Sequence, residues 1–493
     1  MGLALAGPPA GNFRANLAEA TSQPWKGDEE TEACRKESYG VSTITEKLEK
    51  YLFYLLLFSI PFQARKILWY EGWRFMEWQS ISIYMTDLIL VCLFLFWICN
   101  KLKMKNEKVK ITVKNLKFYE YFLILFLVIS AVSVKNSSSY LISWFQCLKL
   151  LEFVAFFFYL KNYALAKIGL YNSFFSIFIG GLLQSIIAVS QFLKQESLGL
   201  WFLGESIFNK EILGVASFYL PNGEKIIRAY GTTPHPNVLA TYIFLAIFSF
   251  YFIYLYSRLH KEHDPMLDDW DKSMLWLHGL LLFAFLTTFS RAIIFIWFVS
   301  FCGRTLTIRL TRSYRLSFGT PEGRKRIKAI LLVSLCVLVI FGSLYFNEIK
   351  TRLAIHLDDQ AVELRTFYIG EVFKNGFNLF GVGIGNFVGW MVQNRPNLPT
   401  YAYQPVHNIY LLVYSETGIL GTSFFILFLV FVIRGFILKT GLKKSYHLSF
   451  LVFFCSLLFV GLFDHLLMTL QQGGLIFWGS LRILTFLSND DIM

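Results

Sequence analysis

Long apolar runs separated by short polar connections recur along almost the whole chain. Most runs approach the ~20 residues with which an α-helix crosses a hydrocarbon core of ~30 Å. The pattern therefore predicts an all-α polytopic membrane protein with about twelve transmembrane helices. A β-barrel would instead show ~10-residue segments of alternating apolar and polar residues, which the sequence lacks. We expect spans at residues 48–63, 81–100, 118–134, 140–160, 169–193, 238–256, 274–289, 292–302, 329–346, 419–438, 448–463 and 475–487.

The polar remainder divides the chain. Residues 1–47 lack an apolar core after a basic start, so they are not a signal peptide, and we expect a disordered cytoplasmic tail. Residues 48–488 form the transmembrane domain. Within it, residues 347–418 make the longest polar interval, and we expect a large external loop between the ninth and tenth helices.

Charge sets the orientation. The 493 residues are 55% hydrophobic and carry a formal net charge of +13, concentrated in connections such as 101–117 and 304–328. Basic connections stay in the cytoplasm, so both termini are expected inside and the 347–418 loop outside. The same rule explains the charge without a nucleic-acid partner. Six of the seven cysteines lie in apolar runs with no metal-ligand spacing, so no metal site is expected.

Two short segments bring arginines to the expected outer face. Arg228 precedes a turn containing a glycine and two prolines, which ends at Asn237 before the sixth span. Taken alone, this stretch is more simply a helix-entry turn with a solvated arginine. Arg291 follows Ser290 between the seventh and eighth spans, which are two short helices or one kinked stretch. An arginine at this depth faces a protein interior or a water-filled cavity, or it snorkels to the interface.

The external loop offers further candidates. Residues 361–373 have helical spacing and carry Arg365. The glycine-rich segment 381–386 has no preceding strand and no following Lys-Ser/Thr pair, so it predicts tight backbone packing and not a nucleotide loop.

The end of the loop carries a titratable group. His407 and Asn408 stand at the start of an apolar run, where an imidazole base would meet both lipid and water. A lone histidine is nevertheless more often structural. Glu416 either caps the tenth span or orients the site.

Taken together, these motifs resemble the O-antigen ligase and polymerase family of membrane glycosyltransferases. The resemblance covers about Arg228 to Val430, and the N-terminal spans agree only in hydrophobicity. The residues that carry it are Arg228-x-x-Gly231-x-x-x-x-Pro236-Asn237, Ser290-Arg291, Arg365 followed by Gly381-Val382-Gly383-Ile384-Gly385-Asn386-Phe387, His407-Asn408-x-Tyr410-Leu411 and Glu416-x-Gly418-x-x-Gly421.

The resemblance implies a GT-C-like fold in the bacterial inner membrane, with the large loop in the periplasm. In the family a glycan moves from undecaprenyl pyrophosphate to an acceptor hydroxyl, with inversion and without metal or cofactor. Ligases use the lipid A core as acceptor, polymerases use another repeat unit, and relatives use serine or threonine of a protein. We favour the ligase, although the external motifs are shared.

A pyrophosphate leaving group in a metal-free site needs guanidinium groups, which bind oxyanions bidentately and stay charged. By resemblance, Arg228, Arg291 and Arg365 form the anion clamp, and His407 deprotonates or positions the acceptor hydroxyl. The same analogy makes Asn237, Asn408 and Glu416 further substrate-binding residues, alongside Arg365.

Two other classes compete with the transferase. A lipid or solute transporter also needs many helices and embedded charge, but it predicts inverted repeats and charges near the bilayer midplane. We find no internal repeat, and the candidate charges gather at one face. A purely structural membrane protein leaves the long external loop without a role.

Overall fold

The computed structural model describes residues 44–72, 75–103, 116–256, 266–310, 321–354, 360–374, 378–442 and 445–487. Contacts divide the chain into Met1–Glu49 and Lys50–Met493. The expected tail lies outside the described residues as far as residue 43. Helix α3 (Ile44–Ser59) begins four residues before the first predicted span.

The described chain is mostly helical, and every predicted span contains a helix. Six helices of the described part are long and apolar enough to cross a membrane, namely α5, α6, α8, α9, α13 and α17. This supports a polytopic membrane protein, whereas the count of about twelve crossings stays a prediction. The helices after α3 are α4 (Met85–Lys103), α5 (Phe118–Ser133), α6 (Tyr140–Tyr159), α7 (Leu165–Ile168), α8 (Leu170–Lys194), α9 (Pro236–Tyr256), α10 (Met266–Thr287), α11 (Arg291–Leu310), α13 (Pro321–Leu344), α14 (Phe346–Leu353), α15 (Gln360–Lys374), α16 (Phe387–Asn394), α17 (Ile409–Thr440), α18 (Ser445–Val460), α19 (Leu466–Thr469) and α20 (Gln471–Phe486).

Helix α9 is the centre of the bundle. Its apolar window is completely buried, and it contacts α8, α10, α11, α13 and α20. Against α8 the approach is very close, because a Cβ on Gly180 or Gly181 would lie 2.3 Å from the Tyr242 hydroxyl or the Ala246 Cβ. Small residues at this contact let two membrane helices pack backbone to backbone. The sequence therefore holds α8 and α9 together, and with them the connections at their ends.

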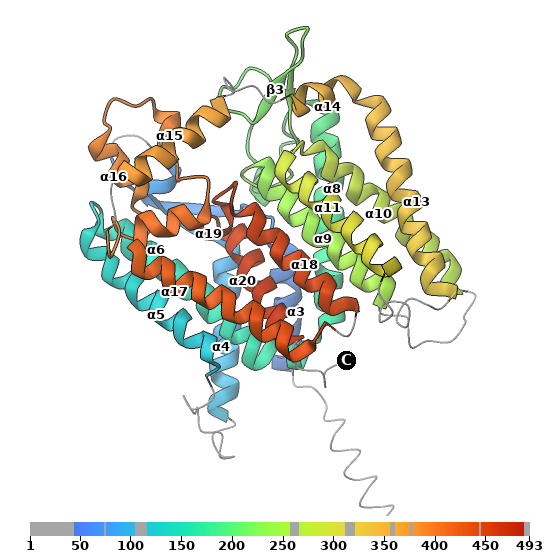
Figure 1. The fold of residues 1–493 in the computed structure, drawn as a ribbon, viewed down its shortest axis with the longest axis horizontal. Coiled ribbons are helices and arrows are strands. Elements are labelled where there is room, and N and C mark those ends of the chain that lie inside the picture. The colour runs from blue at the N-terminus through green and yellow to red at the C-terminus, as the bar shows by residue number, and fades with distance from the viewer. Residues whose placement is uncertain are drawn as a thin grey trace, which may run out of the picture. The chain divides into compact units, whose positions relative to one another are not determined.

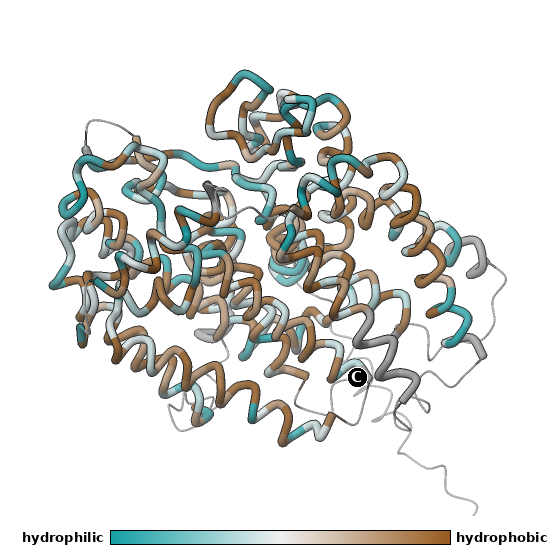
Figure 2. The backbone as a smooth tube through the Cα atoms, turned by 45° about the horizontal axis from the view of Figure 1, so that its top comes forward, coloured by the Kyte–Doolittle hydropathy of each residue, from teal (hydrophilic) through white to brown (hydrophobic). Residues whose placement is uncertain are grey.

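The outer helices present apolar side chains outward. On α13 only 17% of the apolar window is buried, and Leu332, Leu335 and Val339 are exposed. Figure 2 shows hydrophobic residues running along the helices and hydrophilic residues gathering in the connections. Such a pattern would be an aggregation hazard in water, but it suits a helix that faces lipid.

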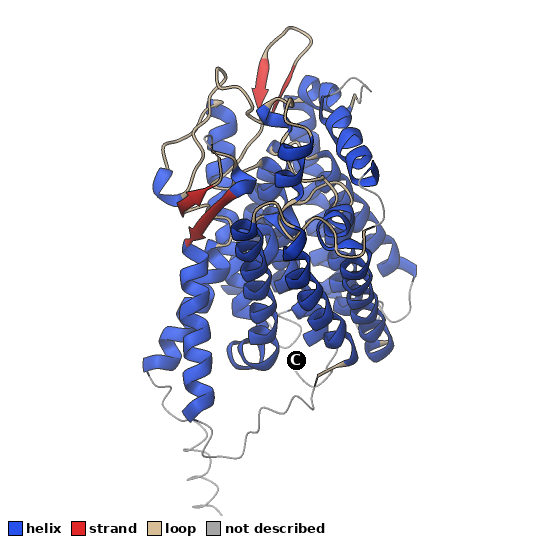
Figure 3. Cartoon of the chain, turned by 90° about the vertical axis from the view of Figure 1, so that its left-hand side faces the viewer, coloured by secondary structure: helices blue, strands red, loops and turns tan. Residues whose placement is uncertain are grey.

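Two antiparallel hairpins depart from the predicted all-α fold (Figure 3). One pairs β1 (Arg65–Tyr70) with β2 (Ser80–Tyr84), and the other pairs β3 (Ser217–Tyr219) with β4 (Lys225–Ile227). In β2 the serines are buried while Ile83 is exposed, so the usual alternation signal is inverted. The short 3-10 or π segments are η1 (Glu77–Gln79), η4 (Val134–Asn136), η5 (Leu160–Ala164), η6 (Trp201–Leu203) and η7 (Thr400–Ala402).

The expected external loop contains ordered structure (Figure 1). It holds α14, α15, α16 and η7, and the helical spacing predicted for residues 361–373 is confirmed by α15. Helix α17 starts at Ile409, ten residues before the predicted tenth span. A non-helical residue, Gly418 (φ 71°, ψ −171°), divides it close to the predicted boundary.

The glycine-rich segment packs tightly, as its sequence predicted. Gly381, Gly383 and Gly385 all have positive φ, and a Cβ on Gly381 would lie 2.3 Å from the backbone of Glu416. The N–H groups of Val382 and Gly383 donate to carbonyls of residues 415 and 416, at 2.9 and 3.0 Å. The segment is thus bound to the kink in α17, which fixes the loop relative to the helix below it.

Candidate active site

A cavity of about 1190 Å³ brings together residues from widely separated parts of the chain, between Gln63 and Leu470. Arg228, Arg291, Arg365 and His407 line it, together with Asn237. Residues spaced far apart in the sequence therefore share one compartment, as the anion-clamp hypothesis requires. Its remaining charged lining residues are Arg65, Glu77, Arg352 and Asp464.

One wall of the cavity is apolar. It is built mainly by α11, α13 and the turn before α11, and its residues include Ile293, Phe298, Leu338 and Phe341. The cavity lining therefore combines cations and imidazoles with hydrocarbon side chains. This combination fits a ligand with an anionic group joined to an apolar chain.

Arg228 is held by a buried hydrogen-bond network. Its Nε donates to the Thr288 carbonyl and its Nη2 donates to Asn237 Oδ1, both at 2.7 Å. The same oxygen accepts from Ser290 Oγ at 2.9 Å, while Asn237 Nδ2 donates to Asp464 Oδ2 at 2.7 Å. Burial, and next the charge of Arg352, lower the pKa of Arg228 to about 9, so the guanidinium remains charged at neutral pH.

Two glutamines of α8 stiffen the turn after Arg228. Gln191 Oε1 accepts from the Gly231 N–H and its Nε2 donates to the Gly231 carbonyl, at 2.7 and 2.8 Å. Gln184 makes a similar pair of contacts with Thr232, at 2.9 and 2.7 Å. Helix α8, which the sequence predicted only as a membrane span, therefore holds the turn after Arg228 in place.

The turn before Arg291 is a real helix break. Helices α10 and α11 are separated by residues 288–290, so 274–302 is two helices and not one kinked stretch. Phe289 has a φ of 44°, an uncommon conformation for a bulky residue. Its carbonyl accepts from Arg352 Nε at 3.3 Å. Arg352 is thus a further arginine of the cavity, and the sequence analysis did not select it.

His407 lies in a stack of rings. Its imidazole stacks on Tyr368 with centroids 5.8 Å apart and meets His465 edge to face at 4.8 Å. Its Nδ1 is buried and has no hydrogen-bond partner among the described residues. Burial, together with the charge of Arg365, lowers the pKa of His407 although Asp464 opposes the shift. The ring is therefore neutral at pH 7 and has a nitrogen able to accept a proton.

Asp464 and His465, between α18 and α19, were missed as site residues. Burial alone would raise the pKa of Asp464, but three nearby histidines and the Asn237 hydrogen bond lower it to about 2. The carboxylate is therefore an anion in the cavity wall. Burial lowers the pKa of His465 to about 3. The sequence did contain a signal for this pair, because an acid and an imidazole stand side by side in a short turn between two apolar runs.

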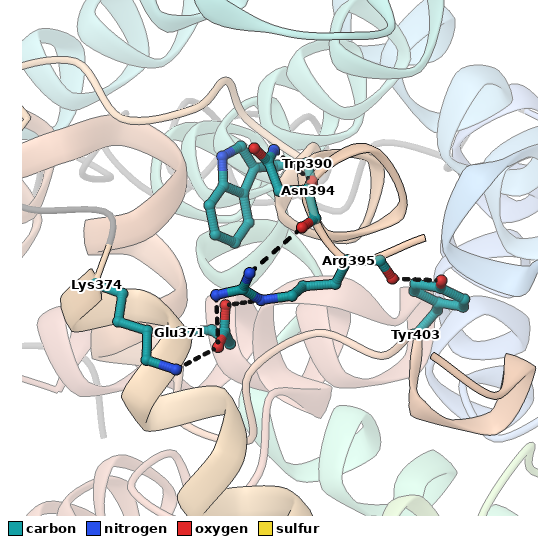
Figure 4. A network of polar contacts seen from close by, with 6 residues as sticks. All are labelled: Glu371, Lys374, Trp390, Asn394, Arg395 and Tyr403. Atoms are coloured by element: carbon teal, nitrogen blue, oxygen red, sulfur yellow. Dashed lines mark hydrogen bonds and ion pairs between the residues drawn. The ribbon is translucent and has the colours of Figure 1, made fainter. Parts of the chain in front are cut away.

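A polar network outside the cavity fixes the loop that carries Arg365 and His407 (Figure 4). Glu371 on α15 accepts from Arg395 Nε at 3.0 Å and from Lys374 Nζ at 2.9 Å. The Tyr403 hydroxyl donates to the Arg395 carbonyl at 2.7 Å. These contacts tie α15 to the segment between α16 and η7, and so set the position of Arg365 relative to His407.

Two predicted substrate-binding residues do not line this cavity. Asn408 is the N-cap of α17, and its Oδ1 accepts from the N–H groups of Tyr410 and Leu411 at 2.9 and 3.0 Å. Glu416 lines a smaller, neighbouring cavity and accepts from the Phe387 N–H at 3.5 Å. The structure therefore gives Asn408 a helix-capping role and separates Glu416 from the arginine cluster.

Metal-binding geometry is not found in the described part of the chain, where no group of three His, Cys, Asp or Glu is placed to hold an ion. The cavity lining brings together five guanidinium groups, of which that of Arg228 is buried, and the imidazole of His407. Such a set can stabilise negative charge and provide an acceptor for a proton.

Comparison with known proteins gives one family. The family model described as O-antigen ligase matches residues 276–426. That region includes Arg291, Arg365 and His407, whereas Arg228 and Asp464 lie outside it. No curated protein matches the chain.

Proposed function

We propose, from the match of the O-antigen ligase family model to residues 276–426, that this chain is a membrane glycosyltransferase. The proposed reaction moves a glycan from undecaprenyl pyrophosphate to an acceptor hydroxyl of the lipid A core, at the periplasmic face of the bacterial inner membrane. Its proposed partners are that lipid-linked donor, the acceptor and the surrounding lipids.

The observation that carries the proposal is the convergence of Arg228, Arg291 and Arg365 with His407 on one cavity. The three arginines come from a loop, a helix start and an external helix, so their common position is a property of the fold. Each guanidinium can give two parallel hydrogen bonds to a phosphate. A pyrophosphate would meet more positive than negative charge here.

In the proposed step, His407 accepts the proton of the acceptor hydroxyl as the oxygen attacks the anomeric carbon. The new C–O bond forms while the bond from that carbon to the pyrophosphate oxygen breaks. The electron pair leaves with the pyrophosphate, whose extra charge the arginines stabilise. Attack opposite the leaving group inverts the anomeric centre. Base assistance is typically worth ~10²–10⁴-fold, and charge stabilisation is usually the larger contribution.

The apolar wall supports a lipid-linked donor. Residues of α11 and α13 would contact the polyprenyl chain while the diphosphate reaches the arginines. A soluble nucleotide sugar would leave this wall without a role. The same geometry also accommodates a polysaccharide polymerase or a protein O-oligosaccharyltransferase, which differ in acceptor and not in leaving group.

The test uses the full chain in proteoliposomes with undecaprenyl-pyrophosphate-linked glycan and lipid A core. We expect wild-type transfer, and its loss in His407→Ala and Arg291→Ala. Arg434→Ala, at an exposed arginine of α17, is the matched control and should keep activity. Unchanged transfer by both His407→Ala and Arg291→Ala would refute the assignment of this cavity as the active site. Substrate movement across the membrane without transfer would favour a transporter.

A further inference from the structure

A second chamber, of about 100 Å³, adjoins the large cavity. The two share Arg65, Glu77, Trp78 and Leu470 in their walls. A buried water needs ~10–15 Å³, so the chamber has room for several water-sized groups. This is the scale of one sugar ring with its hydroxyls.

The charged residues of the second chamber are largely paired. Arg65 binds Glu77 through both guanidinium ends, with Nη2 to Oε2 at 2.6 Å. Lys149 Nζ contacts carboxylate oxygens of Asp87 and Glu152, both at 2.8 Å. The large cavity has arginines in excess of carboxylates, whereas here each lysine or arginine already has an acidic partner. The remaining acid of the lining, Glu416, accepts from the Phe387 N–H, so the chamber has no lysine or arginine in excess and is suited to a neutral, polar ligand.

Two buried oxygens in the chamber lining have no hydrogen-bond partner among the described residues. They are Ser82 Oγ and Gln471 Oε1, on side chains that are 4% and 3% exposed. Burying an oxygen without a hydrogen bond is unfavourable, so a ligand with hydroxyl donors would be favoured at these two oxygens. The Gln471 amide is held in place because its Nε2 donates to Glu152 Oε1 at 3.0 Å.

An aromatic residue connects the two compartments. The Trp78 indole lies edge to face on His465, with centroids 4.9 Å apart, and His465 meets His407 at 4.8 Å. Pro405, two residues before His407, lines the second chamber. A hydroxyl group projecting from this chamber past Trp78 would therefore approach the His465–His407 ring pair.

We propose that the second chamber is the acceptor subsite and holds the acceptor's sugar ring through Ser82, Gln471 and Trp78. This rests on the proposed transferase function. The donor's diphosphate and lipid occupy the large cavity, so the neutral chamber receives the sugar whose hydroxyl is glycosylated. In-line attack requires the acceptor and the leaving group on opposite sides of the anomeric carbon, so the reaction needs separate subsites for the two.

The experiment measures KM for each substrate separately, with the full chain in proteoliposomes, undecaprenyl-pyrophosphate-linked glycan and lipid A core. Ser82→Ala and Gln471→Ala should each raise the acceptor KM about five- to tenfold, as expected for one lost hydrogen bond, and leave the donor KM within about twofold. The matched control is Gln472→Ala. Gln472 is equally buried, but it lines neither compartment, so both KM values should stay unchanged.

The outcomes separate this inference from the function itself. Absence of transfer by the wild type refutes the transferase. Transfer with unchanged acceptor KM in Ser82→Ala and Gln471→Ala refutes the subsite alone. A rise in donor KM instead assigns the chamber to the donor glycan. Equal effects of Gln471→Ala and Gln472→Ala on the acceptor KM would mean that altered packing causes the change, and would refute the subsite. Ser82→Ala removes one oxygen only and keeps the test open if the glutamine variants fail to fold.

Discussion

Replacing Asn237 by alanine should disable the cavity without removing any of its arginines. The Asn237 side chain joins three segments, because it accepts from Arg228 at 2.7 Å and from Ser290 at 2.9 Å, and donates to Asp464 at 2.7 Å. Both acceptor positions of its oxygen are already used within the protein. Its role in this structure is therefore to position Arg228, and not primarily to bind substrate as the sequence suggested.

The magnitude follows from the bonds lost. Hydrogen bonds to charged groups contribute ~1.5–3 kcal/mol, and the bonds to Arg228 and Asp464 are of this kind. Since ~1.4 kcal/mol corresponds to a tenfold change in rate, loss of both predicts a decrease in kcat of at least ~100-fold. Ser290→Ala removes only the neutral contact and should cost about fivefold.

The assay is single-turnover transfer from saturating lipid-linked donor, with thermal unfolding in detergent as a check of folding. The matched control is Asn222→Ala, an asparagine in the exposed turn between β3 and β4 that lines neither cavity. Asn237→Ala within threefold of wild type, with an unchanged melting temperature, would refute the idea that this network positions Arg228.

Four further expectations come from the same geometry. The pKa of His407 is lowered, so the imidazole stays neutral as the pH falls, and the acid limb of the kcat–pH profile should lie below the usual histidine value of ~6.5. In His407→Ala this acid limb should disappear and kcat should fall by ~10²–10⁴-fold. Arg365→Lys should impair donor binding about tenfold, because a lysine cannot form the bidentate contact, and donor titration measures this. Burial would raise the pKa of Glu371, but Lys374 and Arg395 lower it below its unfolded value of ~4.3. The ionised carboxylate therefore stabilises the loop above pH ~4.3, and this stabilisation is lost as the pH falls further. Glu371→Gln should flatten the dependence of melting temperature on pH in that acid range. Transfer measured with excess EDTA should equal transfer without it.

The helices were readable from the sequence because membrane spans need a long apolar run, and that signal is strong. Their ends were less accurate where an external helix continues into a span. Helix α17 begins at Ile409 although hydrophobicity alone suggested 419, since its first turns are amphipathic and pack on the loop. Gly418 then allows the change of direction, which a hydropathy pattern does not register.

The β1–β2 hairpin was missed for the opposite reason. Its buried residues include Ser80 and Ser82, while Ile67 and Ile83 are exposed, so apolar character points away from the protein core. That inversion makes sense where one face of a strand lines a polar chamber and the other meets lipid or interface. Arg65 and Glu77, which separate the two compartments, could not be recognised without this pairing.

The candidate site was partly predictable. Arg228, Arg291, Arg365 and His407 were selected through the family resemblance, and the structure places all four on one cavity. Arg352, Asp464 and His465 were not selected, because contacts across the bundle give them their importance. No local sequence pattern encodes the approach of His235 and His407, from distant parts of the chain, to the adjacent pair Asp464 and His465.

The charge of the cavity wall explains why its supporting network is so extensive. Five arginines and two carboxylates line it, and Glu77 is already engaged by Arg65. The other carboxylate of that lining is Asp464, and Arg228 is almost completely buried. Burial, and next the charge of Arg352, lower the pKa of Arg228, so holding this cation in the cavity wall opposes folding. Carbonyl groups at Thr288 and Phe289 and the Asn237 amide offset part of that cost. A bound polyanion would offset more of that cost, so the same electrostatics favours a diphosphate over its neutral analogues.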